Sequence, residues 1–180
     1  MKSSVVLSLL FISLQVNASG MLPETSVLLV DAEKGEASMN ITNTDSSPAL
    51  LYTNVVNLPE SNKAVRLIVS QPVVRVEAGA VQRIRFILQT DKPLMQEEFK
   101  RVTFEGIPPK EKGKQKLAIT IRQDLPVIIH PEGLAEDNRP WKHLQWRKKG
   151  NYLEVTNPSN YVVRMTAKFT SLPSGKFGQL

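Results

Sequence analysis

The chain has 180 residues and a formal net charge of +6 at pH 7, with 41% hydrophobic and 22% charged side chains. This balance is ordinary for a globular protein and excludes a disordered or collagen-like chain. Cysteine is absent, which excludes a disulfide scaffold, a zinc-thiolate centre and a thiol nucleophile. The fold must therefore be stabilised by burial of an apolar core.

The N-terminus predicts export. Lys2 precedes an apolar run over residues 5–14, and the small-residue site Val16-Asn17-Ala18 follows it, which is the pattern of a secretory signal peptide. The apolar run is shorter than the ~18 residues that a membrane-spanning helix needs. We therefore predict that residues 1–18 are a signal peptide and that the protein does not insert into a membrane.

Residues 26–129 predict an all-β domain, because short apolar or alternating runs are separated by turn residues. About seven such strands predict an immunoglobulin-like β-sandwich that spans residues 19–130. Residues 94–99 predict one short helical turn before the strand that follows them. The expected strands are Val27–Val30, Ala37–Thr42, Leu50–Val56, Val65–Val69, Gln82–Leu88, Lys100–Phe104 and Leu117–Ile129.

A second, incomplete β domain is predicted for residues 131–180. Pro131-Glu132-Gly133 and the polar stretch 135–140 predict a linker between the two domains. The expected strands of this domain are Tyr152–Thr156 and Tyr161–Thr170. The residues after His130 amount to about half of a sandwich domain, so the second domain is either minimal or truncated.

The segment 117–129 carries the main functional prediction. Its odd positions are apolar almost throughout, and it follows the lysine-rich stretch 108–116. Pro126 favours an edge strand or a bend over a central position. Leu117, Ile119 and Ile121 would then fill the open groove of an incomplete partner domain, while the backbone supplies ladder hydrogen bonds. The alternative is that these three side chains face the core of their own domain.

Several short motifs follow one another in a distinctive order. They are Ile41-Thr42-Asn43-Thr44-Asp45, Gln71-Pro72-Val73-Val74-Arg75-Val76, Gly79, Arg83-Ile84-Arg85, Ile107-Pro108-Pro109, Pro131-Glu132-Gly133-Leu134 and Val155–Val163. In this order, and over the range from Leu22 to Leu180, the chain resembles the PapD-like periplasmic chaperones of pilus assembly.

The resemblance implies two immunoglobulin-like domains behind a signal peptide, a periplasmic location and a function in chaperone-usher pilus assembly. Such a chaperone caps incomplete pilin subunits by donor-strand complementation and delivers them to an outer-membrane usher, without a cofactor. Leu117, Ile119 and Ile121 are then the donor residues. The alternative from another class is an exported immunoglobulin-like adhesion or structural module.

The resemblance also implies a basic cleft that holds the C-terminal carboxylate of the subunit, and here the sequence departs from the family. The family lysine falls at Pro126 and the family arginine near Val27, while Ile129-His130-Pro131 replaces the usual Tyr-Arg-Pro. The predicted replacement is Arg122, which shares a strand face with position 126, or Arg85. A guanidinium group suits this task because it binds a carboxylate through two hydrogen bonds.

No other chemistry is predicted. His130 and His143 have no neighbouring cysteine, so no metal site is expected. The motifs of serine hydrolases, phosphate-binding loops and zinc proteases are absent, which predicts a protein that is not an enzyme. The basic and aromatic residues 141–149 predict a solvated hairpin, with its tryptophans tucked under a small domain, rather than a nucleic-acid surface.

Overall fold

The computed structural model describes residues 20–109, 120–166, 168–170 and 177–179. Within these ranges, one nine-stranded sheet has the order β5-β7-β3-β2-β9-β8-β4-β6, with β1 paired to β3. The predicted signal peptide, residues 1–18, lies outside the described residues. The strands of the nine-stranded sheet are β1 (Met21–Pro23), β2 (Leu28–Asp31), β3 (Glu36–Asn43), β4 (Ala49–Val56), β5 (Val65–Val69), β6 (Val73–Val76), β7 (Val81–Thr90), β8 (Glu98–Ile107) and β9 (Arg122–His130).

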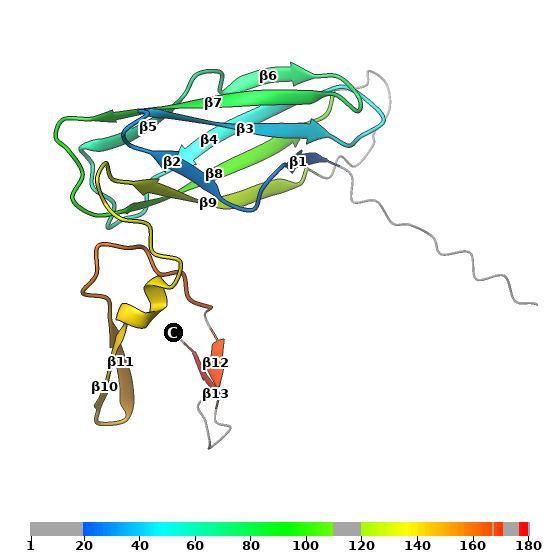
Figure 1. The fold of residues 1–180 in the computed structure, drawn as a ribbon. Coiled ribbons are helices and arrows are strands. Elements are labelled where there is room, and N and C mark those ends of the chain that lie inside the picture. The colour runs from blue at the N-terminus through cyan, green and yellow to red at the C-terminus, as the bar shows by residue number, and fades with distance from the viewer. Residues whose placement is uncertain (1–19, 110–119, 167, 171–176, 180) are drawn as a thin grey trace, which may run out of the picture.

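The main sheet curls into two facing layers (Figure 1). Strands β5, β7 and β3 form one layer, and β9, β8, β4 and β6 form the other. β2 connects the layers because it pairs antiparallel with β3 and parallel with β9. Phe86 on β7 meets Phe104 on β8 edge to face, with ring centroids 6.5 Å apart. The two layers therefore enclose one core.

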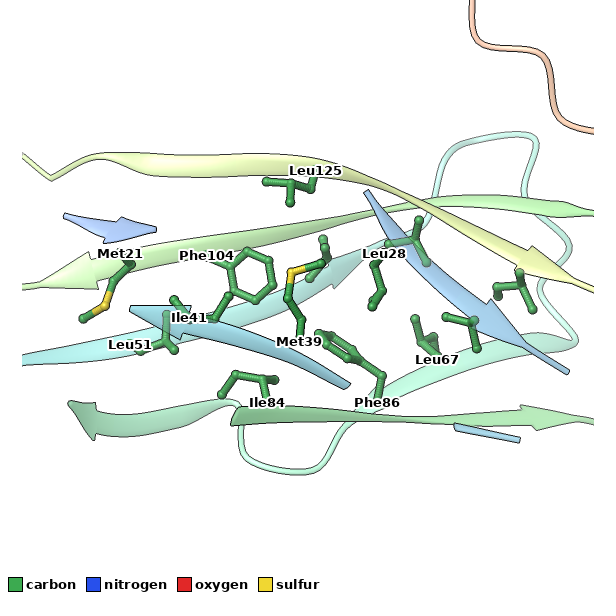
Figure 2. Close-up of a cluster of buried hydrophobic side chains, with 14 of the residues drawn as sticks. Met21, Leu28, Met39, Ile41, Leu51, Leu67, Ile84, Phe86, Phe104 and Leu125 are labelled. Atoms are coloured by element: carbon green, nitrogen blue, oxygen red, sulfur yellow. The ribbon is translucent and has the colours of Figure 1, made fainter. Parts of the chain in front are cut away.

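The alternating residue pattern explains how each strand contributes to this core. Side chains of a strand point to opposite faces in turn, so on β4 the buried Leu51 lies between two exposed neighbours. Figure 2 shows Ile84 and Phe86 entering the core from one side, and Phe104 and Leu125 from the other. Apart from Leu125, all of these side chains are fully buried. Burial of apolar surface thus holds together a chain that has no disulfide.

The all-β prediction is confirmed, and the expected strands between residues 27 and 104 are present with ends displaced by at most three residues. Strands β1 and β6 were not predicted, because runs of three or four residues carry too little periodicity. The prediction of a helical turn at residues 94–99 is wrong. Residues 91–97 form bends and loop, and β8 begins at Glu98, whose backbone pairs with Ile129 on β9.

A buried asparagine joins two turns at one end of the sandwich. Asn43 ends β3, and its Nδ2 donates to the carbonyl oxygens of Ser47 at 3.0 Å, Val76 at 3.1 Å and Glu77 at 3.2 Å. Its Oδ1 accepts the backbone N–H of Asp45 at 3.0 Å. The side chain therefore ties the turn after β3 to the connection between β6 and β7.

The second unit follows β9 and is small. It contains the 3-10 helix η1 (Pro140–His143) and the strands β10 (Gln145–Lys149), β11 (Tyr152–Thr156), β12 (Lys168–Thr170) and β13 (Phe177–Gln179). β10 pairs with β11 and β12 with β13, each pair antiparallel. In the described part of the chain, no helix is long and apolar enough to cross a lipid bilayer.

Two predictions for the second unit need correction. The strand expected at residues 152–156 is confirmed, but of residues 161–170 only 168–170 form a strand. Tyr161 and Val162 instead donate hydrogen bonds to the carbonyl oxygen of Ala135 and to the carboxylate of Glu97. The tryptophans are not tucked under a domain, since Trp141 and Trp146 are 56% and 47% exposed. A two-stranded sheet has too little surface to cover them.

Candidate functional site

Strand β9 changes its neighbours along its length. On one side, residues 122–129 pair with β8, from Arg122 opposite Glu105 to Ile129 opposite Glu98. On the other side, β2 pairs only with residues 127–130. No strand among the described residues pairs with this second side of residues 122–126. We call this side of residues 122–126 the open edge.

The expectation of an edge strand over residues 117–129 is therefore wrong for residues 127–129. These lie inside the sheet, and Val127 and Ile129 are fully buried. Pro126 stands at the boundary, because a proline has no N–H to donate and the ladder with β2 begins one residue later, at Val127. Leu117 and Ile119, two of the three predicted donor residues, lie outside the described residues.

The third predicted donor residue, Ile121, precedes β9 beside the open edge. By strand periodicity it shares a face with Leu125, but its side chain is 47% exposed whereas that of Leu125 is 7% exposed. Ile121 borders a surface hollow that Gly106 and the turn 44–47 also line. An exposed apolar side chain and an unpaired strand edge are thus next to each other in the chain.

The two arginines predicted to anchor a carboxylate lie in different layers. Arg122 begins β9, is exposed and stands opposite Glu105. Arg85 lies on β7, which β3 and β2 separate from β9 in the sheet order. Its Nε donates to Glu36 Oε2 at 2.8 Å, so the charge of Arg85 already has a partner. The structure does not bring the two arginines together.

The sequence reasoning missed Arg101. This residue of β8 stands directly opposite Pro126, the position at which the resemblance places the family lysine. Its Nε donates to Asp124 Oδ1 at 2.7 Å, and its Nη2 donates to the carbonyl oxygen of Asp124 at 2.9 Å. The side chain is 32% exposed. Nothing in the sequence marks Arg101, because its proximity to Pro126 depends on the register of two strands.

Lys100, the neighbouring cation on β8, faces the core instead of the surface. The residue is fully buried, and its Nζ donates to Asn57 Oδ1 at 2.7 Å. Burial lowers the pKa of Lys100, while the nearby Glu98 favours the charged form. Because the ammonium group is buried, Lys100 does not present its charge to a ligand at the open edge.

Glu97 joins the sandwich to the second unit. Its Oε1 lies 2.9 Å from His130 Nδ1, and its Oε2 accepts the backbone N–H of Val162 at 2.7 Å. Its own N–H donates to the carbonyl oxygen of Asn160 at 2.8 Å. His130 Nε2 lies 2.8 Å from the carbonyl oxygen of Leu134. We call the bonds among Glu97, His130 and Val162 the Glu97 clasp.

The geometry of the Glu97 clasp favours a charged imidazole. Both ring nitrogens of His130 face oxygen acceptors, and both can donate only when the ring is protonated. The hydrogen bond to Glu97 accordingly raises the pKa of His130, with smaller contributions from the bond to Leu134 and the charge of Asp31. Burial of the ring opposes this rise.

His143 takes part in packing within the second unit. Its Nε2 lies 2.7 Å from Asp137 Oδ2, and its ring stacks on Tyr161 with centroids 5.9 Å apart. Within the ranges that the structure describes, no three or more histidine, aspartate or glutamate side chains gather as they would around a metal ion.

Comparisons with known proteins point to one family. The family model described as "Pili and flagellar-assembly chaperone, PapD N-terminal domain" matches residues 20–135. The fimbrial chaperone YhcA of Escherichia coli is 61% identical over 172 residues, which cover 94% of this chain and 77% of that protein. The chaperone protein PsaB of Yersinia pestis is 27% identical over 153 residues, which cover 76% of this chain and 56% of that protein.

Solved structures show the same fold. A chain of the Salmonella enterica complex of SafA pilin with the SafB chaperone has a TM-score of 0.73 at 22% identity, covering 89% of this chain and 77% of that one. The Escherichia coli chaperone DraB has a TM-score of 0.69 at 16% identity, covering 89% and 80%. At these identities the likeness concerns the fold alone.

Proposed function

The chain belongs to the family of pili and flagellar-assembly chaperones with a PapD N-terminal domain, and we propose that it caps unfinished pilus subunits in the periplasm. The subunit receives a strand from this chain to complete its sheet and is then delivered to an outer-membrane usher. A relative that is 61% identical over 172 aligned residues is named a fimbrial chaperone, which supports this proposal. So does a related fold that was solved together with a pilin.

The open edge beside the exposed Ile121 is the observation that carries the proposal. An unpaired edge offers its N–H and C=O groups to a partner's sheet. We propose that Leu117, Ile119 and Ile121 fill the groove of the subunit. Burial of three such side chains contributes about 5 to 9 kcal/mol before the ordering of both chains is subtracted.

We also propose that the protein is not an enzyme and needs no cofactor, because a subunit strand that fits better can displace the donated strand without added chemistry. The proposed organisation is a signal peptide over residues 1–18, the capping domain over residues 19–130 and a partial β domain over residues 131–180. Export through the signal peptide would place the chain in the periplasm. The end of β9 at His130, directly before Pro131, supports the domain boundary.

Co-expression with an exported pilin from the same source tests the proposal. Ile119→Asp and Ile121→Asp are each expected to lower pilin recovery by about tenfold or more, because a carboxylate would enter an apolar groove. Ile68→Asp is the matched control, since Ile68 is an exposed apolar residue of β5, at 40% exposure, in the other layer. Thermal unfolding verifies that each variant folds.

Unchanged pilin recovery with both folded isoleucine variants would contradict strand donation. An adhesion or structural module, the alternative function, would not carry a pilin through purification at all. The amount of pilin recovered with the wild-type chain therefore separates the two functions. The isoleucine variants then show which residues belong to the donated strand.

The same assay tests the carboxylate anchor, for which Arg122 and Arg85 were predicted and to which the structure adds Arg101. Arg122→Ala and Arg101→Ala are each expected to weaken capture by about tenfold, since a hydrogen bond to a charged group is lost. Arg85→Ala is expected to change capture little, because Arg85 lies on β7, in the layer opposite β9. A larger loss from Arg85→Ala than from the other two would place the anchor on β7 instead.

A further inference from the structure

The carboxylate of Glu98, the first residue of β8, is buried without a partner. The residue is 9% exposed, and within the described ranges no hydrogen bond or ion pair reaches its side chain. Lys100 acts on Glu98 only through its charge, because Lys100 Nζ donates to Asn57 Oδ1. A buried charge is costly unless a group of opposite charge pairs with it. Glu98 is therefore a carboxylate to which the binding of a cation would be favourable.

Glu98 lines a surface hollow of about 450 Å³ where the sandwich meets the second unit. The walls of this hollow are residues 58–61 and 96–99 of the sandwich and Val162 of the second unit. We call it the Glu98 hollow. Hollows of about 300 to 1,000 Å³ that combine apolar walls with a few polar groups are typical sites for small ligands. The apolar residues of these walls are Leu58, Pro59, Phe99 and Val162.

The oxygens of Glu98 are within reach of a ligand in the hollow. Among the described residues that are not exposed, Thr53 Oγ1 is the only side-chain oxygen or nitrogen that is both fully enclosed and without a hydrogen bond. The Glu98 oxygens also have no hydrogen bond, so they are not fully enclosed. The small accessible surface that they keep is part of a residue that lines the hollow.

The charges around the Glu98 hollow favour a cation. Glu60 and Glu97 line it together with Glu98, and none of its described wall residues is a lysine, arginine or histidine. Both oxygens of Glu97 are already engaged in the Glu97 clasp, whereas Glu60 is exposed. Glu98 also lines a second hollow of about 430 Å³, but Lys92 is among the residues of that wall and would repel a cation. The Glu98 hollow is therefore the better site.

We propose that the Glu98 hollow binds an alkylammonium group, with its charge at Glu98 and its hydrocarbon chain along the apolar walls. An ammonium group offers three donors to a carboxylate, and the methylene groups beside it can bury their surface against apolar side chains. Free aliphatic amines and the lysine side chains of a partner protein both carry this group. Because Val162 belongs to the second unit, an occupant would contact both units beside the Glu97 clasp.

NMR titration of the full chain with hexylamine tests the site, and hexan-1-ol is the uncharged control ligand. Hexylamine is expected to shift the amide signals of Phe99 and Val162 and to bind about tenfold more tightly than hexan-1-ol. Glu98→Gln keeps the shape of the side chain but removes its charge, so it is expected to weaken hexylamine binding by about tenfold. Glu33→Gln is the matched control, since Glu33 is an exposed carboxylate outside the hollow, and its affinity should equal that of the wild type.

Glu60→Lys provides a second variant that leaves the buried residues unchanged, because Glu60 is exposed. A lysine at this position would repel hexylamine or compete with it for Glu98, so binding is again expected to weaken by about tenfold. Three results would each overturn the proposal: a wild-type chain that does not bind hexylamine, equal affinities for hexylamine and hexan-1-ol, and unchanged hexylamine binding in either folded variant.

Co-expression with a pilin separates the two sources of the alkylammonium group, and this arm rests on the proposed capture of pilins. If a lysine of the subunit occupies the hollow, Glu98→Gln is expected to lower pilin recovery by about tenfold, and bound pilin should block hexylamine. If a free amine occupies it, pilin recovery stays at the wild-type amount. The titration uses the chain without a subunit, so its failure would leave the capture of pilins standing.

Discussion

Replacing Asn43 by alanine is expected to lower the free energy of unfolding by about 3 kcal/mol. The side chain of Asn43 is fully buried and donates to three carbonyl oxygens, those of Ser47, Val76 and Glu77. Alanine would leave these acceptors and the N–H of Asp45 without their partner, and an unsatisfied buried group costs about 1 to 3 kcal/mol. The loss is below the sum of these costs, because some of these groups can turn to water at the surface.

Denaturant unfolding followed by fluorescence or circular dichroism measures this loss, and the melting temperature is expected to fall by about 6 to 12 °C. Asn54→Ala is the control, since Asn54 is an exposed asparagine of β4, and substitutions at such surface positions stay within about 0.5 kcal/mol. Equal stability of the Asn43 and Asn54 variants would show that the two turns hold together without the asparagine.

Raising the pH is expected to loosen the second unit by weakening the Glu97 clasp. The folded protein raises the pKa of His130 above its ordinary value, chiefly through the hydrogen bond to Glu97. The resulting stabilisation is fully present below the unfolded pKa of about 6.5 and is lost as the pH rises through the folded pKa. A neutral ring keeps only one of its two donated bonds, so the expected loss is about 1 to 2 kcal/mol.

Limited proteolysis of the second unit between about pH 5.5 and about pH 9 measures this effect, with the ring of His130 followed by NMR over the same range. The matched variant is His130→Arg, because an arginine stays charged throughout this range and can still face Glu97 and Leu134. Cleavage of that variant is expected to change little with pH. Two other charged groups act on the ring, Glu97 itself and Asp31. The charge of Asp31 is balanced by Lys34, whose Nζ lies 3.1 Å from Asp31 Oδ2. Equal pH dependence of the wild type and the variant would assign the effect to another group.

Most strands of the sandwich were predictable because their signal is local. β4 is a largely apolar run that follows the turn residues 43–48, and on β7 polar and apolar side chains alternate from Arg83 to Phe86. Both patterns can be recognised within one short segment. Strands β1 and β6 have three and four residues, too few for the same signal. Residues 161–166 have the composition of a strand, but Val162 donates its backbone N–H to Glu97, 65 positions earlier in the chain.

The candidate site was predictable only in part. The apolar alternation around Ile121 is visible in the sequence, and so is the proline that ends the open edge. The course of β9 from an unpaired edge into the middle of a sheet is not visible, because it depends on pairing with β2, a strand far away in the sequence, which begins at Val127. Arg101 was missed for the same reason, since its position opposite Pro126 follows from the pairing of β8 with β9.

By itself, the sequence determined the all-β class, the positions of most strands and, through the order of its motifs, the chaperone family. These properties depend on residues that are close together in the chain, where side-chain periodicity and turn preferences act directly. Only the tertiary structure decided where β9 is free, which cation lies opposite Pro126, and that Glu97 and His130 meet although 33 positions separate them. Such contacts depend on strand register and on the packing of distant segments, and the free energy that selects them comes from the whole core rather than from any single stretch of sequence.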